Sequence, residues 1–346
     1  MKKPQWKIQF KDLPLIPETK IWIKGNTMMN ATVERQITEK LRLGYSITDS
    51  DEKTLTELES FYNELSIKLE ELEYSSFTLK DLEDFKNYIK YVYNYIALLV
   101  NKIEIFQLYR IVIYSDNKTI TNKKWLTYPP LHVVKKIGKL NRANTTNTTI
   151  FYGAETIDAA LNELKKHIKV NDLVTVGKWV PNVKREFISY PISHSKISYG
   201  INPGSTKAVQ GFLKYSKTQN PNYTKILEHY FQILGYEYSK EVSHHLEYLI
   251  SATFSEDILD NPQNKNTNFD VECIVYPSVG NKFKTSNVAI RRDVFKHNFK
   301  LQKVIEFKVT ETHFDRKESV DVEGINLVEY KNLRETEKFD ENQIIW

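Results

Sequence analysis

The 346-residue chain has only one cysteine, Cys273, and this scarcity limits the chemistry it can support. A single thiol excludes an intramolecular disulfide and any zinc site built from several cysteines. Cys273 lies in an apolar run at 271–276, so we expect a buried structural side chain. The histidines are scattered or, at His244 and His245, adjacent and therefore on different sides of a helix. We expect neither a bound metal nor a metal cofactor.

Long apolar runs and a strong charge bias are also missing. No window approaches the roughly 18 apolar residues that a membrane span requires, and the N-terminal MKKPQWKIQFKD is basic without the apolar run of a signal peptide. We therefore expect a cytoplasmic protein without a membrane partner. The 49 basic and 44 acidic residues leave a net charge of +5, and this small excess gives no argument for a nucleic-acid partner.

Three motifs of common nucleotide-binding and hydrolytic enzymes are absent as well. The chain has no Gly-x-x-x-x-Gly-Lys-Ser/Thr loop, no Gly-x-Gly-x-x-Gly fingerprint and no Gly-x-Ser-x-Gly elbow. A dinucleotide, if bound, must therefore be held without a phosphate-binding loop or a Rossmann turn.

The first hundred residues have helical periodicity. Start signals predict one helix over about 49–73, and Thr78 with Asp81 predicts the start of a second. The short connection at 74–77 makes the two helices natural antiparallel neighbours. A second copy of the chain is the other possible partner, from which we predict a homodimer or larger assembly. Either partner would cover a seam of apolar residues three and four apart, formed by Leu82, Phe85, Ile89, Val92, Ile96, Leu99 and Ile103.

From about residue 106 the periodicity is mixed, which predicts an α+β fold. The length is comfortable for two domains, and we place an N-terminal helical module at 1–104 and a second domain at 105–346. We read 181–204 as a long loop and 260–268 as a mobile link. Strands are predicted at 106–113, 149–154, 271–276, 287–291 and 302–310, and helices at 156–168, 205–216, 223–235 and 240–259.

The segment 142–163, RANTTNTTIFYGAETIDAALNE, carries the most specific functional pattern. It spaces Arg142, Tyr152 and Glu163 at intervals of ten and eleven residues. Tyr152 ends a predicted strand, and Thr156 can cap a helix that carries Glu163 in its second turn, facing back toward the strand. A guanidinium, a phenol and a carboxylate in one pocket suit a ligand with phosphates, a flat ring and a cationic centre. Dinucleotide cofactors have all three.

Each side chain of this pattern has a functional and a structural interpretation. Arg142 could grip a diphosphate or be a surface arginine, and Tyr152 could stack on nicotinamide or pack in the core. Glu163 could stabilise a ribosyl cation or be a solvated helix residue. Ser278 could bond a ribose hydroxyl or a phosphate, or be a turn serine. Arg110, on an apolar strand, needs an ion-pair partner or a ligand.

The order of these features resembles the RES-domain family, toxin-like enzymes that consume NAD. The resemblance covers roughly residues 105–310. The chain departs from the family at Leu140–Asn141 and Asn147, where glycines are usual, and at Val279–Gly280, where a basic residue is frequent. The matching segments are Leu108–Tyr109–Arg110–Ile111, Arg142–Ala143–Asn144, Tyr152–Gly153–Ala154–Glu155, Glu163, Tyr276–Pro277–Ser278 and Asn287–Val288–Ala289–Ile290.

The resemblance implies an ADP-ribosyltransferase-like mixed sheet with flanking helices and NAD as substrate. It implies cleavage of the nicotinamide–ribose bond, transfer of ADP-ribose to inorganic phosphate or water, depletion of NAD as a toxin or defence effector, and control by an antitoxin protein. The alternatives are a transferase that modifies a macromolecule and a non-catalytic nucleotide-binding module. The implied catalytic residues are Arg142, Tyr152, Glu163 and Ser278, with Arg110, Asn144 and Asn287 binding the cofactor.

Overall fold

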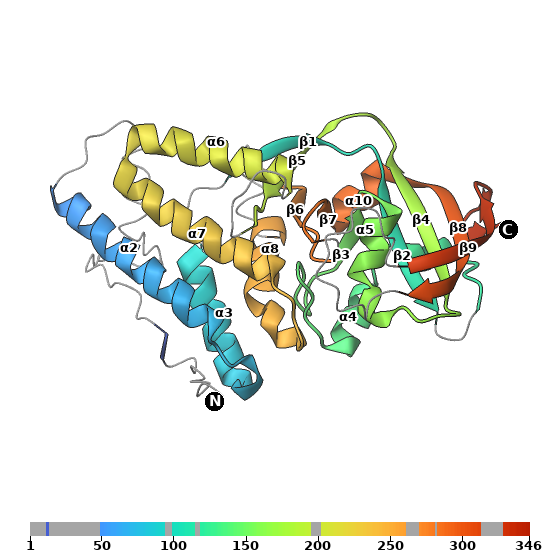
Figure 1. Cartoon of the computed structure of the whole chain (residues 1–346), viewed down its shortest axis with the longest axis horizontal. Coiled ribbons are helices and arrows are strands. Elements are labelled where there is room, and N and C mark those ends of the chain that lie inside the picture. The colour runs from blue at the N-terminus through green and yellow to red at the C-terminus, as the bar shows by residue number, and fades with distance from the viewer. Residues whose placement is uncertain are drawn as a thin grey trace, which may run out of the picture.

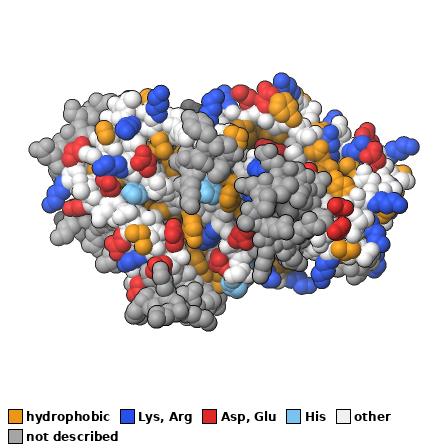
Figure 2. Space-filling view, viewed as in Figure 1, with side chains coloured by type: hydrophobic (Ala, Val, Ile, Leu, Met, Phe, Trp, Pro, Cys, Tyr) orange, Lys and Arg blue, Asp and Glu red, His pale blue; other side chains and the backbone are white. Residues whose placement is uncertain are grey.

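The protein contains a large mixed β-sheet with flanking helices, as the α+β prediction requires. Figure 1 shows most of the sheet on one side of the molecule and a group of helices gathered on the other. On the face shown in Figure 2, basic and acidic side chains are interspersed. In this computed structural model the described residues are 12–13, 49–93, 99–114, 118–194, 202–260, 270–280, 282–312 and 328–346.

Nine strands of the described residues form the sheet, in the order β1-β5-β6-β7-β3-β2-β4-β8-β9. Neighbouring strands are antiparallel except β5 and β6, which are parallel. The strands are β1 (Asn101–Glu104), β2 (Leu108–Tyr114), β3 (Ile150–Ala154), β4 (Leu173–Pro181), β5 (Glu186–Pro191), β6 (Cys273–Pro277), β7 (Ser286–Arg291), β8 (Phe299–Thr312) and β9 (Val328–Thr336).

The helices divide into a group beside the sheet and single helices on its faces. The first group comprises α2 (Asp49–Glu70), α3 (Leu79–Tyr93), α6 (Pro203–Gln219), α7 (Pro221–Ser239) and α8 (Leu249–Asp260). On the sheet lie α5 (Ile157–Glu163), packed on β2 and β3, and α10 (Arg292–Asn298), packed on β7 and β3. The short helix α4 (Leu131–Ile137) precedes β3. No helix in the described ranges is both long and apolar enough to cross a membrane.

The five predicted strands correspond to β2, β3, β6, β7 and β8, so the main strand predictions are confirmed. Cys273 is fully buried, as expected, and burial raises the pKa of its thiol. The loop predicted at 181–204 is wrong in part, because Phe187 and Tyr190 are buried and the segment forms β5. The link predicted at 260–268 lies outside the described residues apart from Asp260.

The two N-terminal helices do not form the predicted hairpin as their main contact. Instead α2 packs along α7 and α3 packs along α8, so all four share one apolar core. Ion pairs connect the same helices, for example Lys86 with Glu256 at 2.7 Å. The 1–104 and 105–346 division remains a prediction, and the shared core leads us to expect that 105–346 alone would expose apolar surface of α7 and α8.

The apolar seam of the second helix is also revised. Phe85 and Ile89 are completely buried within one chain, so they cannot be the contact between two copies. Among the described residues the helix ends at Tyr93. The predicted seam continued to Ile103, but Asn101–Glu104 forms strand β1, which pairs with β5. Val92 and Ile96 cannot be judged, since their side chains lie outside the described part. The homodimer stays a prediction without this contact.

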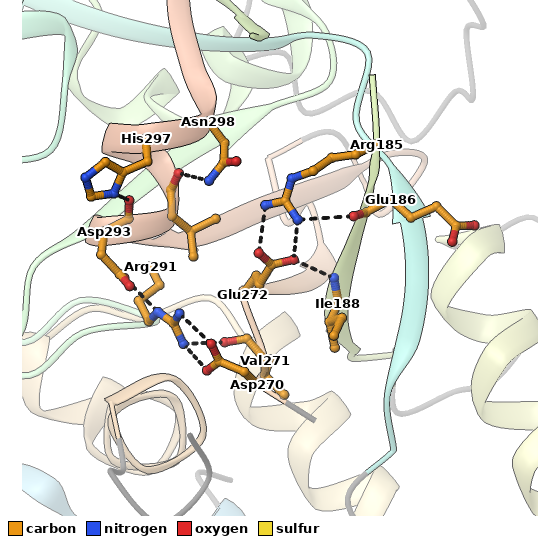
Figure 3. Close-up of polar contacts among 11 residues, drawn as sticks. Arg185, Glu186, Ile188, Asp270, Val271, Glu272, Arg291, Asp293, His297 and Asn298 are labelled. Carbon is orange, nitrogen blue, oxygen red and sulfur yellow. Dashed lines mark hydrogen bonds and ion pairs between the residues drawn. The ribbon is translucent and has the colours of Figure 1, made fainter. Parts of the chain in front are cut away.

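Ion pairs fasten one end of the central strands β5, β6 and β7 (Figure 3). Arg291, 6% exposed, donates to both carboxylate oxygens of Asp270 at 2.5 and 2.9 Å and to Asp293 at 2.7 Å. Arg185 donates to both oxygens of Glu272 at 3.2 and 2.7 Å. Paired N–H donors match a carboxylate in geometry as well as charge. These ion pairs lie away from the opposite end of β6 and β7, where β6 ends at Pro277 and β7 begins at Ser286.

The core position of α3 gives a first prediction. Ile89→Glu would place a carboxylate where no partner is available, and we expect it to lower the free energy of unfolding by about 3–5 kcal/mol or to prevent folding. Asn87→Glu, on the exposed side of the same helix, should change it by less than about 0.5 kcal/mol. Urea unfolding checks both. An Ile89→Glu protein as stable as the Asn87→Glu control would show that α3 does not belong to this core.

Candidate functional site

A pocket of about 310 Å³ opens where β2, β3, β6 and β7 meet α5 and the start of α8. Five of the residues predicted from the sequence line this pocket, namely Arg110, Arg142, Tyr152, Glu163 and Asn287. Two others, Ser278 and Asn144, lie immediately behind its wall and contact residues that line it. The fold therefore brings together residues that are far apart in the sequence.

Glu163 is the last residue of α5, and the helix begins as predicted. The Thr156 hydroxyl accepts a hydrogen bond from the Ala159 amide at 3.1 Å and caps the helix. The apolar side of α5, which includes Ala160, is buried against the sheet. Since a helix carries its side chains at fixed angles around its axis, this packing directs Glu163 into the pocket wall.

The carboxylate of Glu163 is held by two donors from a distant segment. Oε1 accepts from the Ser278 hydroxyl at 2.6 Å and from the Gly280 amide at 3.0 Å, across 115 and 117 residues of sequence. Oε2 accepts no hydrogen bond from the described residues and is free for a ligand. Ser278 is completely buried and does not line the pocket. The Ser278 hydroxyl therefore positions the Glu163 carboxylate in this structure, where a contact with the ligand was predicted.

Gly280 stands where the sequence departs from the RES pattern, and its lack of a side chain is required here. A Cβ atom on Gly280 would lie 2.3 Å from the carbonyl carbon of Asn162 and 2.5 Å from the amide nitrogen of Glu163. Backbone meets backbone at this point, so no side-chain rotation could relieve the overlap. The absent Cβ lets the Gly280 amide reach the carboxylate.

Tyr152 and Asn144 hold the loop between α4 and β3. The Tyr152 hydroxyl accepts from the Ala143 amide at 2.9 Å and donates to Oδ1 of Asn144 at 2.8 Å. Asn144 is 2% exposed and donates to carbonyls within its own loop, those of Thr145 and Thr148. Asn144 does not line the pocket, and its predicted contact with a cofactor stays a prediction. Burial raises the pKa of Tyr152, so its hydroxyl stays protonated.

Arg142 caps the end of a helix. Its guanidinium donates to the carbonyls of Glu237, Tyr238 and Lys240 at 3.3, 2.8 and 3.1 Å, where α7 ends. These carbonyls have no partner within the helix, and they form the negative end of its dipole. Three of the five N–H groups of Arg142 are thus used. In the structure Arg142 fixes the pocket wall, and its predicted contact with a diphosphate stays a prediction.

Arg110 is a pocket cation without a carboxylate partner among the described residues, and its Cζ lies 5.7 Å from the ring centre of Phe151. Its Nη1 donates to the Tyr152 carbonyl at 3.3 Å, and its Nε is buried without a partner among the described residues. Strands β2 and β3 share a single residue pair, Tyr109 with Ala154, and the guanidinium reaches across to β3 beyond that pair. Burial lowers the pKa of Arg110 to about 10, which still leaves it charged at pH 7. A half-buried cation without a carboxylate partner among the described residues favours an anionic ligand.

Three tyrosines in the wall, Tyr109, Tyr248 and Tyr276, were missed as site residues. Tyr276 belongs to the Tyr-x-Ser segment, so the motif itself carried the signal. Tyr248 comes from a turn before α8 and lies under the Arg142 guanidinium, 5.0 Å from ring centre to Cζ. No sequence signal marks it. Burial raises the pKa of Tyr276, and the nearby Tyr152 and Glu163 raise it further.

Comparison with known proteins adds no relative: no family model, no curated protein and no solved structure matches this chain. Within the described ranges, no group of three or more His, Cys, Asp or Glu side chains could hold a metal ion.

The steric requirement at Gly280 gives a second prediction. Gly280→Ala should force the loop away from α5 and lower the free energy of unfolding by about 1–3 kcal/mol. Gly211→Ala in α6, where a Cβ meets nothing within 4 Å, should raise it by about 0.5–1 kcal/mol, since alanine is the better helix former. Thermal or urea unfolding measures both. Equal stability of the two variants would refute the close approach.

The capping role of Arg142 gives a third. Arg142→Lys keeps the charge, but one ammonium cannot satisfy three carbonyls spread over the end of α7, so we expect a loss of about 2–3 kcal/mol in the free energy of unfolding. Denaturant unfolding of this variant and of Arg142→Ala checks the assignment. If the lysine variant is as stable as the wild type, charge alone suffices and the capping role is wrong.

Proposed function

We propose that this pocket binds NAD and that the protein cleaves its nicotinamide–ribose bond, passing ADP-ribose to inorganic phosphate or water. The observation that carries the proposal is the state of Glu163. One carboxylate oxygen is fixed by Ser278 and Gly280, and the other is free in a pocket that also contains Arg110, which has no carboxylate partner among the described residues. This arrangement supports the NAD-consuming activity that the RES resemblance implies.

A fixed carboxylate suits this reaction for an electrostatic reason. Departure of nicotinamide leaves positive charge on the ribose ring, as in the oxocarbenium-like transition states of glycoside hydrolysis. A negative group that is already in place stabilises this charge without reorganising as the bond breaks. The two donors on Oε1 supply that rigidity, and Oε2 supplies the charge on the ligand side.

The remaining walls suit the other parts of NAD. The ring of Tyr248, Tyr276 or Tyr152 could lie against the cationic nicotinamide ring, an arrangement favoured by the negative faces of aromatic rings. Arg110 offers its charge to the diphosphate. The volume of about 310 Å³ is near the lower limit for small-molecule sites. The pocket would therefore enclose the nicotinamide riboside end and leave the adenosine outside.

Depletion of NAD would make the protein a toxin or defence effector acting in the cytoplasm, and a separate antitoxin protein would be its natural control. These roles follow from the proposed reaction and rest on the resemblance. A transferase acting on a macromolecule would use the same pocket and differ only in the acceptor.

The products of the reaction test the proposal. The purified full-length protein should be incubated with NAD, with and without inorganic phosphate, and the products identified by mass spectrometry. We expect many turnovers, with nicotinamide released and ADP-ribose or its phosphate ester formed. Label that remains attached to protein would favour the macromolecular transferase. Binding of NAD without turnover would leave a non-catalytic nucleotide-binding module.

The role of Glu163 gives a fourth prediction. Glu163→Gln keeps the size of the side chain and removes its charge, so turnover should fall by about 10²–10³-fold while NAD binding changes far less. Asp158→Asn removes a carboxylate from the exposed side of the same helix and should leave turnover unchanged. Steady-state kinetics and calorimetric binding separate the two effects. Near wild-type turnover by Glu163→Gln would remove this helix from the catalytic pocket.

A further inference from the structure

Asn202, at the start of α6, is a buried polar residue that connects three segments. It is 0% exposed, and its backbone adopts the left-handed conformation, with φ 41° and ψ 64°. Its Nδ2 donates to the Ile192 carbonyl at 2.9 Å, just beyond the end of β5. Its Oδ1 accepts from the Ser286 hydroxyl at 2.5 Å, and its backbone amide donates to the Phe283 carbonyl at 2.9 Å.

The first turn of α6 does not explain this side chain. The Asn202 side chain makes no capping hydrogen bond to the helix. Asn220 occupies the same position before α7, and its Oδ1 does accept from the Tyr223 amide at 2.9 Å. Asn202 therefore directs its side-chain groups away from the helix, Nδ2 to Ile192 beyond β5 and Oδ1 to Ser286, where the loop between β6 and β7 ends.

That loop carries both donors to Glu163. It is closed on itself by the Ser278 amide, which donates to Thr285 at 3.0 Å, and by the Phe283 amide, which donates to Ser278 at 2.8 Å. Lys282 and Phe283 have φ values of 57° and 66°, a conformation that residues with a Cβ rarely adopt. Such a backbone persists only where surrounding contacts hold it. Asn202 supplies two of these contacts, at Phe283 and at Ser286 just after the loop.

We propose that Asn202 is a positioning residue for Glu163. It fixes the 278–286 loop, and the loop in turn holds the Ser278 hydroxyl and the Gly280 amide against the Glu163 carboxylate. This inference rests on the proposed function for its effect on catalysis, but the fixing of the loop is a separate claim that needs no substrate. Helix α6 thereby becomes part of the support of the site, although none of its residues lines the pocket.

The test uses Asn202→Gly in the full-length protein. Glycine accepts the left-handed backbone and removes only the side chain, so the hydrogen bonds of Asn202 with Ile192 and Ser286 should be lost without new strain, while its backbone bond to Phe283 stays. Turnover of NAD should fall by about 10–100-fold, as expected for a small displacement of a catalytic group, with little change in KM.

Asn220→Ala is the matched control. This substitution removes the cap of α7 and lowers the stability of the protein. Asn220 does not contact the loop, so turnover should stay at the wild-type level. If loss of turnover came only from a less stable fold, both variants would lose it alike. If turnover is lost equally in Asn202→Gly and Asn220→Ala, the positioning role is refuted.

Amide hydrogen exchange gives a readout that does not depend on NAD. Exchange within 278–286 and at the end of α5 should become faster in Asn202→Gly and remain unchanged in Asn220→Ala. If the wild type consumes no NAD, the proposed function fails while this measurement still decides the positioning. Unchanged exchange in Asn202→Gly overturns the inference. Should that variant fail to fold, Ser286→Ala, which removes only the hydroxyl facing Asn202, must show the same faster exchange or the inference is wrong.

Discussion

The candidate site depends on the hydrogen bonds that Ser278 and Gly280 donate to Glu163. Two donors on one oxygen remove the rotational freedom of a carboxylate that would otherwise be mobile at the end of a seven-residue helix. They also bring α5 and the β6–β7 loop into contact over more than a hundred residues of sequence. An electrostatic site works by having its charges in place before the reaction, so this contact is the condition for the rest of the pocket.

The helices around residues 203–260 make that condition possible. Arg142 ties the loop before β3 to the end of α7, and Asn202 ties the loop after β6 to the start of α6. The same helices bury α2 and α3, so the N-terminal part and the site share one support. Residues 203–260 are thus the scaffold on which both walls of the pocket rest.

The sequence predicted the strands and site residues whose identity is set by local chemistry. Thr156 caps its helix, and Glu163 lies in the pocket, because a capping hydroxyl and an apolar stripe determine a helix start and its buried face. The sequence could not predict the roles of Arg142 and Asn144. A guanidinium or an amide binds a carbonyl as readily as a ligand, and only the fold decides which lies within reach. Tyr248, on an irregular turn, carried no pattern at all.

The two arginines of the site illustrate how burial separates structure from function. Arg142 donates hydrogen bonds to three carbonyls at the end of α7, so these carbonyl dipoles already compensate its charge. Arg110 makes one bond to a carbonyl and keeps a buried Nε without a partner among the described residues. A half-buried cation without a carboxylate partner destabilises a fold, and such a cost is commonly retained where a ligand supplies the missing charge. Arg110, on the apolar strand β2, is therefore the stronger candidate for meeting a phosphate.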